Sequence, residues 1–187
     1  MEPVTEANLR AFLEHLGEQY QGSATLYLLG GSALCLLGSL RVTVDVDYWY
    51  DVSSEEEAGF KAAVEILAGE MHLDAEDVSL DEFVPLPIGA YERRQLVGRF
   101  GDVEVYIFDL YTIALSKIAR GFEADLEDVI FLLQGGLIEF AELEQIFKQV
   151  LPQASQVDII PQEFEDYFAE LRRRMRKLRR EKRRKRI

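Results

Sequence analysis

A strand–helix–strand segment near the N-terminus is the feature that most limits how this chain can fold. An apolar strand over Leu26–Leu29 meets Gly30-Gly31-Ser32, and a short helical stretch over residues 33–40 follows. A second strand is expected over residues 42–50. Its side-chain period of two places on one face Arg41, Thr43, Asp45, Asp47 and Trp49. The segment therefore predicts a sheet from which two carboxylates project side by side.

The residue types in this segment suit a phosphate ligand and a metal ion. Asp45 and Asp47 supply the oxygen ligands that a hard divalent cation such as Mg²⁺ prefers. Gly30 and Gly31 let a ligand approach the backbone closely. We expect Ser32 to cap the helix that follows, whose free N–H groups and positive end favour phosphate. Each pattern alone is common, as a turn or as a solvated strand face, but their order within one unit favours a functional site.

The segment resembles the Gly-Ser and Asp-x-Asp signature of polymerase-β-type nucleotidyltransferases. Gly-Gly-Ser-x-Leu, followed by Arg41-x-Thr43-x-Asp45-x-Asp47, is most similar to AbiEii-like and minimal nucleotidyltransferases of bacterial toxin–antitoxin and phage-defence systems. The resemblance spans roughly residues 24–135. It implies the nucleotidyltransferase fold and Mg²⁺ or Mn²⁺ as the cofactor. It also implies that a nucleoside triphosphate binds beside Gly30, Gly31, Ser32, Arg41 and Thr43.

A third carboxylate is expected on a neighbouring strand, because two-metal transfer needs a further oxygen ligand for the second ion. Glu104, in Val103-Glu104-Val105, has the apolar–acid–apolar pattern of a strand residue. Asp109 at the end of the same strand is the alternative, although it could instead cap the following helix. We favour Glu104 as the metal ligand and keep Asp109 as an accessory residue.

A second group of charged residues lies on the apolar faces of two predicted helices. Lys117 falls beside Ile113 and Ala114, while Asp125 and Asp128 share faces with Val129 and Leu132. Acids on an inward face need partners, so Lys117 and Asp125 could form a structural ion pair.

The family resemblance offers a different role for the same residues. It implies that Lys117 binds the triphosphate and that Asp125 assists catalysis, with Asp128 as an accessory acid. Ala124 stands where the family usually has arginine. Arg120 or Arg41 could supply the missing positive charge.

The C-terminus differs sharply in charge from the rest of the chain. Of the 21 Lys and Arg residues, twelve lie within residues 171–187, beside the single acid Glu181. The net charge of −13 therefore divides into about +11 for this tail and about −24 for the body. Such a tail can neutralise nucleic-acid phosphates, or it can fold back on its own acidic body. The residues expected to contact nucleic acid are Arg172, Arg173, Arg174, Arg176, Lys177, Arg179 and Arg180.

The remaining pattern predicts an α/β (α+β) N-terminal part and a helical C-terminal part. Helices are expected over residues 6–19, 53–68, 110–119, 124–133 and 139–150, and a last one from residue 162. Residues 96–100 and 103–108 form a predicted hairpin, and residues 71–90 a loop with a short strand near Phe83-Val84.

The domain organisation follows from these elements. We divide the chain into a nucleotidyltransferase core over residues 1–109, a helical part of the same domain over residues 110–170, and a basic helical tail over residues 171–187. A short mixed β-sheet flanked by helices thus precedes a helical bundle.

These features lead us to expect a metal-dependent nucleotidyltransferase. It would move a nucleoside monophosphate to an acceptor hydroxyl, with RNA, and a tRNA 3′ end in particular, as the first candidate by resemblance. There are two alternatives. One is an antitoxin-like enzyme that modifies a partner protein, and the other is a degenerate fold that binds a toxin, an antitoxin or RNA.

The sequence has no long apolar run, and its N-terminus is acidic. We therefore expect a cytoplasmic protein without membrane contact.

Overall fold

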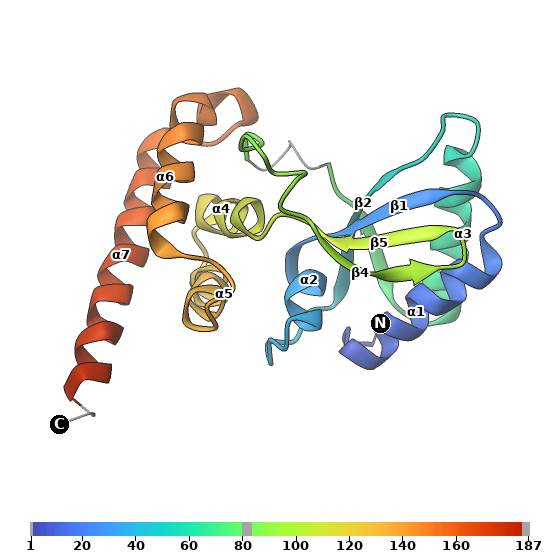
Figure 1. The fold of residues 1–187 in the computed structure, drawn as a ribbon, viewed down its shortest axis with the longest axis horizontal. Coiled ribbons are helices and arrows are strands. Elements are labelled where there is room, and N and C mark those ends of the chain that lie inside the picture. The colour runs from blue at the N-terminus through green and yellow to red at the C-terminus, as the bar shows by residue number, and fades with distance from the viewer. Residues whose placement is uncertain (1, 80–83, 185–187) are drawn as a thin grey trace. The chain divides into compact units, whose positions relative to one another are not determined.

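A computed structural model describes residues 2–79 and 84–184, without the side chains of residues 182 and 183. The described chain forms two compact units (Figure 1). The first comprises residues 2–79 and 89–109, and the second comprises residues 84–88 and 110–184. Phe83 of the predicted short strand and residues 185–187 of the predicted tail lie outside the described residues.

The first unit contains a mixed sheet, as predicted, and this sheet has five strands. Its strands are β1 (Ala24–Leu28), β2 (Asp45–Asp51), β3 (Asp74–Asp77), β4 (Gln95–Phe100) and β5 (Val103–Ile107). They lie in the order β3-β2-β1-β5-β4. β1 pairs with β2 antiparallel and with β5 parallel, β3 pairs parallel with β2, and β4 pairs antiparallel with β5. The β4–β5 pair confirms the predicted hairpin.

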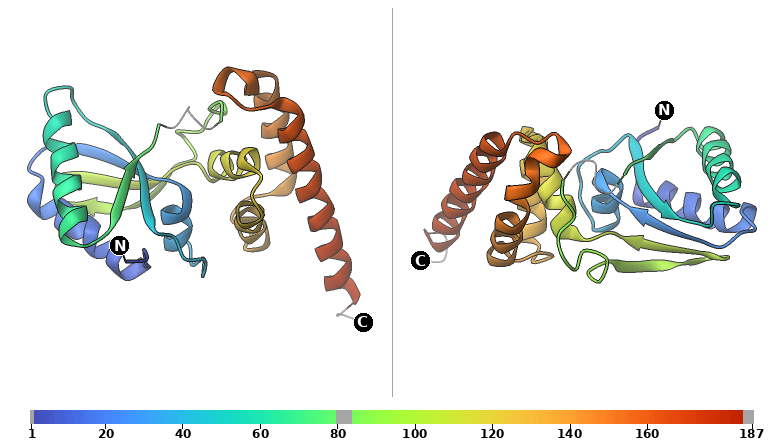
Figure 2. Two further views of the ribbon diagram at one scale, coloured as in Figure 1. Left: turned by 180° about the vertical axis from the view of Figure 1, so that it is seen from behind. Right: turned by 90° about the horizontal axis from the view of Figure 1, so that it is seen from above.

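Helices α1 (Glu6–Gln19) and α3 (Glu57–Glu70) cover one face of this sheet (Figure 2). Thr5 and Asn8 form a capping box at the start of α1, which fixes its first residue. The ring of Phe60 on α3 packs against Tyr50 of β2 and against Tyr20, which follows α1. The covered face is thus the one that carries the apolar even-numbered residues of β2, and Asp45 and Asp47 project from the other.

Helix α2 (Gly30–Leu36) begins three residues earlier than predicted. The two glycines and Ser32 form its first turn, and the N-cap is Leu29, without a side-chain cap. The expectation that Ser32 caps this helix is therefore wrong. Strand β2 starts only at Asp45, and Thr43 before it forms an isolated antiparallel bridge with Val4.

Strand β3 lies in the segment that was predicted to be a loop. Its sequence, Asp-Ala-Glu-Asp, consists of residues that are rare in strands. The register with β2 aligns Asp45 with Asp74 and Asp47 with Glu76. Pairing with β2, and not intrinsic preference, makes this segment a strand.

The second unit is helical, as predicted. It contains α4 (Leu110–Arg120), α5 (Glu123–Gln134), α6 (Phe140–Val150), the 3-10 helix η1 (Leu151–Val157) and α7 (Pro161–Arg184). Phe147 of α6 packs against Phe164 and Phe168 of α7, with ring centroids 4.8 and 4.1 Å apart. The basic stretch continues α7 without a break. In the described part of the chain, no helix combines the length and the apolar character that crossing a bilayer requires.

Candidate functional site

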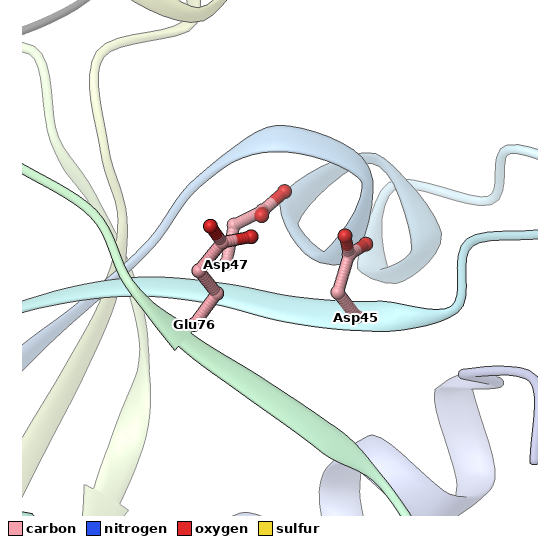
Figure 3. Close-up of side chains that lie close together, drawn as sticks. All are labelled: Asp45, Asp47 and Glu76. Atoms are coloured by element: carbon pink, nitrogen blue, oxygen red, sulfur yellow. The ribbon is translucent and has the colours of Figure 1, made fainter. Parts of the chain in front are cut away.

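Three carboxylates converge on the open face of the sheet. One oxygen each of Asp45, Asp47 and Glu76 lies within 4.8 Å of the other two. Asp45 and Asp47 rise from β2 and Glu76 from β3, all on the same side of the two strands (Figure 3). The aspartates are half-buried and Glu76 is exposed. We call these three residues the acid triad.

The acid triad fits a divalent cation. Two oxygens bound to one Mg²⁺ at 2.0–2.1 Å lie up to about 4.2 Å apart, so small side-chain rotations would bring all three into contact with one ion. Three like charges this close repel one another, and a cation between them relieves that repulsion. Because all three side chains offer carboxylate oxygens, the donor set suits a hard cation better than a soft metal.

Hydrogen bonds from neighbouring residues hold the two aspartates in place. The Thr43 hydroxyl, which is buried, donates to Oδ1 of Asp45 at 2.9 Å. The backbone N–H of Gly31 donates to Oδ2 of Asp47 at 3.2 Å. Two of the residues predicted to bind the nucleotide therefore contact the acids directly, and so orient the oxygens that would face a metal.

The two glycines are required by the close approach of β2 to α2. Gly30 has φ +47°, and a Cβ there would lie 1.7 Å from Oδ2 of Asp47. A Cβ on Gly31 would lie 2.4 Å from the Thr43 hydroxyl oxygen. Any larger residue would displace Asp47 or Thr43. The glycines thus make room for the acid triad itself.

Ser32 is fully buried and bonds to backbone. Its hydroxyl lies 2.8 Å from the carbonyl oxygen of Leu29 and 3.0 Å from that of Asp47. It ties the first turn of α2 to the middle of β2. Arg41, also predicted to bind nucleotide, is exposed ahead of β2.

Glu104, the predicted third carboxylate, does not lie beside Asp45 and Asp47. It aligns across β1 with Asp51, since both pair with Thr25. Asp51 is four residues beyond Asp47, or about 13 Å along the strand. Glu104 instead accepts a hydrogen bond from the Tyr106 hydroxyl at 3.1 Å. Glu76 takes its place, and only the apolar–acid alternation of Leu73 to Glu76 could have pointed to it.

Adjacent acids of β3 face opposite sides of the sheet. Asp77, next to Glu76, turns toward α3 and forms an ion pair with Lys61 at 3.1 Å. On this face, burial raises the pKa of Tyr48 to about 12, and nearby Asp77 adds to the effect. The Lys61–Asp77 pair joins β3 to α3 and so supports the strand that carries Glu76.

Asp109, the alternative acid, forms a bidentate ion pair with Arg93. The two bonds measure 2.8 and 2.7 Å, and the Asp109 side chain is only 1% exposed. The sequence offered no signal for this pair. It fastens the turn over residues 89–94 to the end of β5.

The second predicted group comes together inside the helical unit. Lys117, 1% exposed, donates to Asp128 at 2.6 Å and to Asp125 at 3.4 Å. Arg120 donates to the same oxygen of Asp125 at 2.6 Å. Two cations thus balance two carboxylates inside this unit. This arrangement agrees with the interpretation of Lys117 and Asp125 as a structural ion pair. A role for Lys117 or Asp125 in catalysis stays a prediction.

The basic residues of α7 divide into two sets. Arg172 pairs with Glu144, Arg173 with Glu170, and Arg174 with both Glu123 and Glu170. Arg174 lowers the pKa of both glutamates by hydrogen bonding. Further along the helix lies a second set, exposed and outside any ion pair found among the described residues: Arg176, Lys177, Arg179 and Arg180. We call these four residues the exposed basic set.

Comparison with known proteins identifies the broad class of this chain. A family model described as "Nucleotidyltransferase of unknown function (DUF6036)" matches residues 7–179, which include the acid triad and most of both units. A search of curated proteins found no match, and neither did a search of solved structures.

Proposed function

Because the chain belongs to the nucleotidyltransferase family DUF6036, we propose that it transfers a nucleoside monophosphate from a nucleoside triphosphate to an acceptor hydroxyl. The observation that carries this proposal is the acid triad, in which oxygens of Asp45, Asp47 and Glu76 lie within 4.8 Å of one another. Two of its members, Asp45 and Asp47, form the Asp-x-Asp pattern that follows Gly-Gly-Ser in the sequence.

The acid triad would hold Mg²⁺ or Mn²⁺. When bound, the cation would supply positive charge beside the reacting phosphate. Thr43 and Gly31 keep the oxygens of Asp45 and Asp47 aimed at it, so little reorganisation is needed when substrate binds. Gly30 and Gly31 have no side chains, so a triphosphate bound at the acid triad would approach the backbone at the start of α2 closely.

RNA is the acceptor that the charge distribution supports best. The body of the chain is strongly acidic and would repel RNA. The exposed basic set on α7 offers four cations that bind no acid of the described chain, and these can neutralise phosphates. Arg172 and Arg174 bind Glu144 of α6 and Glu123 of α5, so we assign them to anchoring α7, whereas Arg173 pairs with Glu170 within α7 itself.

The sequence resemblance to AbiEii-like enzymes refines this proposal to a toxin-like enzyme that modifies a tRNA 3′ end. On this view the protein works in the cytoplasm with a cognate antitoxin. A protein acceptor would instead indicate an antitoxin-like role.

The test of the transfer reaction uses each α-labelled nucleoside triphosphate with Mg²⁺ or Mn²⁺, and either total tRNA or lysate protein as acceptor. We expect label on RNA with the natural chain. Loss of at least about 100-fold is expected for Glu76→Gln, since a metal ligand matters at least as much as the residues that orient it. Glu104→Gln is the matched control that leaves the triad intact and should keep activity. Equal activity of Glu76→Gln and Glu104→Gln would overturn the proposed site.

The test of RNA binding replaces the exposed basic set with alanine. Four lost contacts to single-stranded RNA should lower the slope of log affinity against log salt by roughly 3. Replacing Arg172 and Arg173 with alanine is the control and should change the slope much less. An unchanged slope in the first variant would remove α7 from the RNA interface.

A further inference from the structure

A row of aromatic side chains crosses the open face of the sheet beside the acid triad. Trp49 of β2, Tyr27 of β1 and Tyr106 of β5 stand in register across three neighbouring strands. The ring of Tyr27 lies 5.2 Å from Trp49 and 5.8 Å from Tyr106, with planes 33° and 26° apart. The three rings therefore stand side by side on one face of the sheet, and we call them the aromatic row.

The aromatic row begins next to a residue of the acid triad. Trp49 follows Asp47 by two residues on the same face of β2, a separation of about 6.7 Å. At its far end, the guanidinium of Arg94 lies over the Tyr106 ring, 5.0 Å from its centroid, and Arg94 is exposed. The row thus runs from the acid triad to an exposed cation.

The turn over residues 89–94 crosses this face without burying the row completely. Tyr91 meets Tyr27 and Trp49 edge-on, each at 6.3 Å, and remains 40% exposed. Trp49 and Tyr106 are half-buried, while Tyr27 at the centre is only 6% exposed. Tyr27 is therefore a core residue of the row, and the accessible aromatic surface lies at Trp49 and Tyr91.

We propose that Trp49 and Tyr91 form a stacking surface for a nucleobase whose phosphate lies at the acid triad. This inference rests on the proposed nucleotidyl transfer. Every nucleobase has a π-face that stacks on aromatic rings. A separation of about 6.7 Å from Asp47 to Trp49 is comparable with the span of one sugar between its phosphate and its base. The base belongs either to the incoming triphosphate or to the last nucleotide of the acceptor, since the chemistry of stacking is the same.

Trp49 is the one tryptophan of the chain, so its fluorescence reports directly on this surface. The test compares three ligands in the presence of Mg²⁺: inorganic tripolyphosphate, a non-hydrolysable nucleoside triphosphate, and a short oligoribonucleotide with a 3′-deoxy end that cannot accept label. We expect at least one base-bearing ligand to quench Trp49 emission beyond tripolyphosphate. Quenching by the triphosphate assigns the base to the incoming nucleotide, and quenching by the oligoribonucleotide alone assigns it to the acceptor.

Affinity measurements by calorimetry on three variants complete the test. Trp49→Leu should bind the quenching ligand roughly 5- to 150-fold more weakly, the range expected for one lost base stack, with tripolyphosphate binding unchanged. Trp49→Phe keeps an aromatic face and should restore most of the affinity. Phe122→Leu removes an exposed aromatic ring, 68% exposed, from the helical unit and should change nothing.

The outcomes separate this inference from the function on which it rests. One outcome is that tripolyphosphate binds in a metal-dependent way and that no base adds quenching or affinity. This outcome contradicts the stacking surface and is consistent with the metal site. Quenching by a base-bearing ligand that is independent of Mg²⁺ and of Glu76 supports stacking and contradicts the metal site.

Discussion

Two pairs of aspartates in this protein have opposite surroundings. Asp125 and Asp128 on α5 are fully buried, and Lys117 and Arg120 of the same unit bind them. Asp45 and Asp47 on β2 are half-buried, accept bonds from a hydroxyl and a backbone N–H, and have a third carboxylate beside them. The first arrangement balances charge within the fold, whereas the second gathers like charge at the surface.

The comparison teaches how to separate a structural acid pair from a site. A charge-balanced, buried network gains its stability from being complete, so removing any member leaves an unpaired buried charge. A cluster of like charges gains nothing from its own members and is stabilised by an external cation. The two pairs should therefore respond in opposite ways to mutation and to metal.

The largest effect is expected from Lys117→Met. It leaves Asp125 and Asp128 buried without the lysine and should destabilise the helical unit by about 3–5 kcal/mol. Equilibrium urea unfolding followed by helical circular dichroism measures this. Lys148→Met removes only a largely exposed pair with Glu144 and should stay within about 1 kcal/mol. If Lys117→Met and Lys148→Met lower the free energy of unfolding by the same small amount, the Lys117 network does not stabilise the helical unit.

The acid triad should behave in the opposite way. Asp45→Asn with Asp47→Asn removes repulsion, so the free energy of unfolding without metal should not fall. The natural chain should gain about 2.7 kcal/mol when Mn²⁺ is present at 100 times its dissociation constant, and the double variant should gain none. Thermal unfolding with and without Mn²⁺ measures both. If the double variant without metal loses as much free energy of unfolding as Lys117→Met does, the two aspartate pairs do not differ in the way proposed.

A smaller effect is expected from Thr43→Val, which keeps the shape of the side chain and removes the bond to Asp45. Metal affinity should fall roughly 10- to 100-fold, as for other residues that orient a metal ligand. Thr43→Ser keeps the hydroxyl and should retain most of the affinity. Calorimetric titration with Mn²⁺ distinguishes the two, and equal affinities would show that Thr43 only fills space.

The smallest effect concerns the acids that anchor α7. Hydrogen bonding to Arg174 lowers the pKa of Glu123 and of Glu170 below the ordinary value of 4.5. A carboxyl whose pKa is lowered in the folded state stabilises that state at pH values above its ordinary pKa. This contribution disappears as the pH falls through the lowered pKa. Between pH 7 and pH 3, the melting temperature of Glu123→Gln should therefore fall less than that of the natural chain. Glu127→Gln, an exposed neighbour on α5, should follow the natural chain.

The parts of the fold that the sequence predicted share strong local signals. Helix α1 has a capping box and an apolar stripe, and the β4–β5 hairpin has apolar strands around Gly101-Asp102. Each signal lies within a few residues of the element that it defines. Asp45 and Asp47 were predicted to share a face for the same reason, since a strand alternates side chains whatever surrounds it.

The errors concern residues whose partners lie far along the chain. Ser32 looked like a helix cap, yet its hydroxyl lies near the carbonyl of Asp47, fifteen residues later. Glu104 had the better strand pattern, yet its register places it opposite Asp51 across β1. The Arg93–Asp109 pair gave no sequence signal because nothing local brings the two together.

The sequence by itself determined the helices, the hairpin, the position of two acids on one strand face and the separation of a basic helix from an acidic body. Only the tertiary structure decided which third carboxylate completes the triad, which arginines of α7 stay exposed, and which aromatic rings line up beside Asp47. Periodicity and capping act over one or two turns, and residue type alone reveals them. Strand order and register join segments tens of residues apart, and they are fixed by packing of the whole sheet.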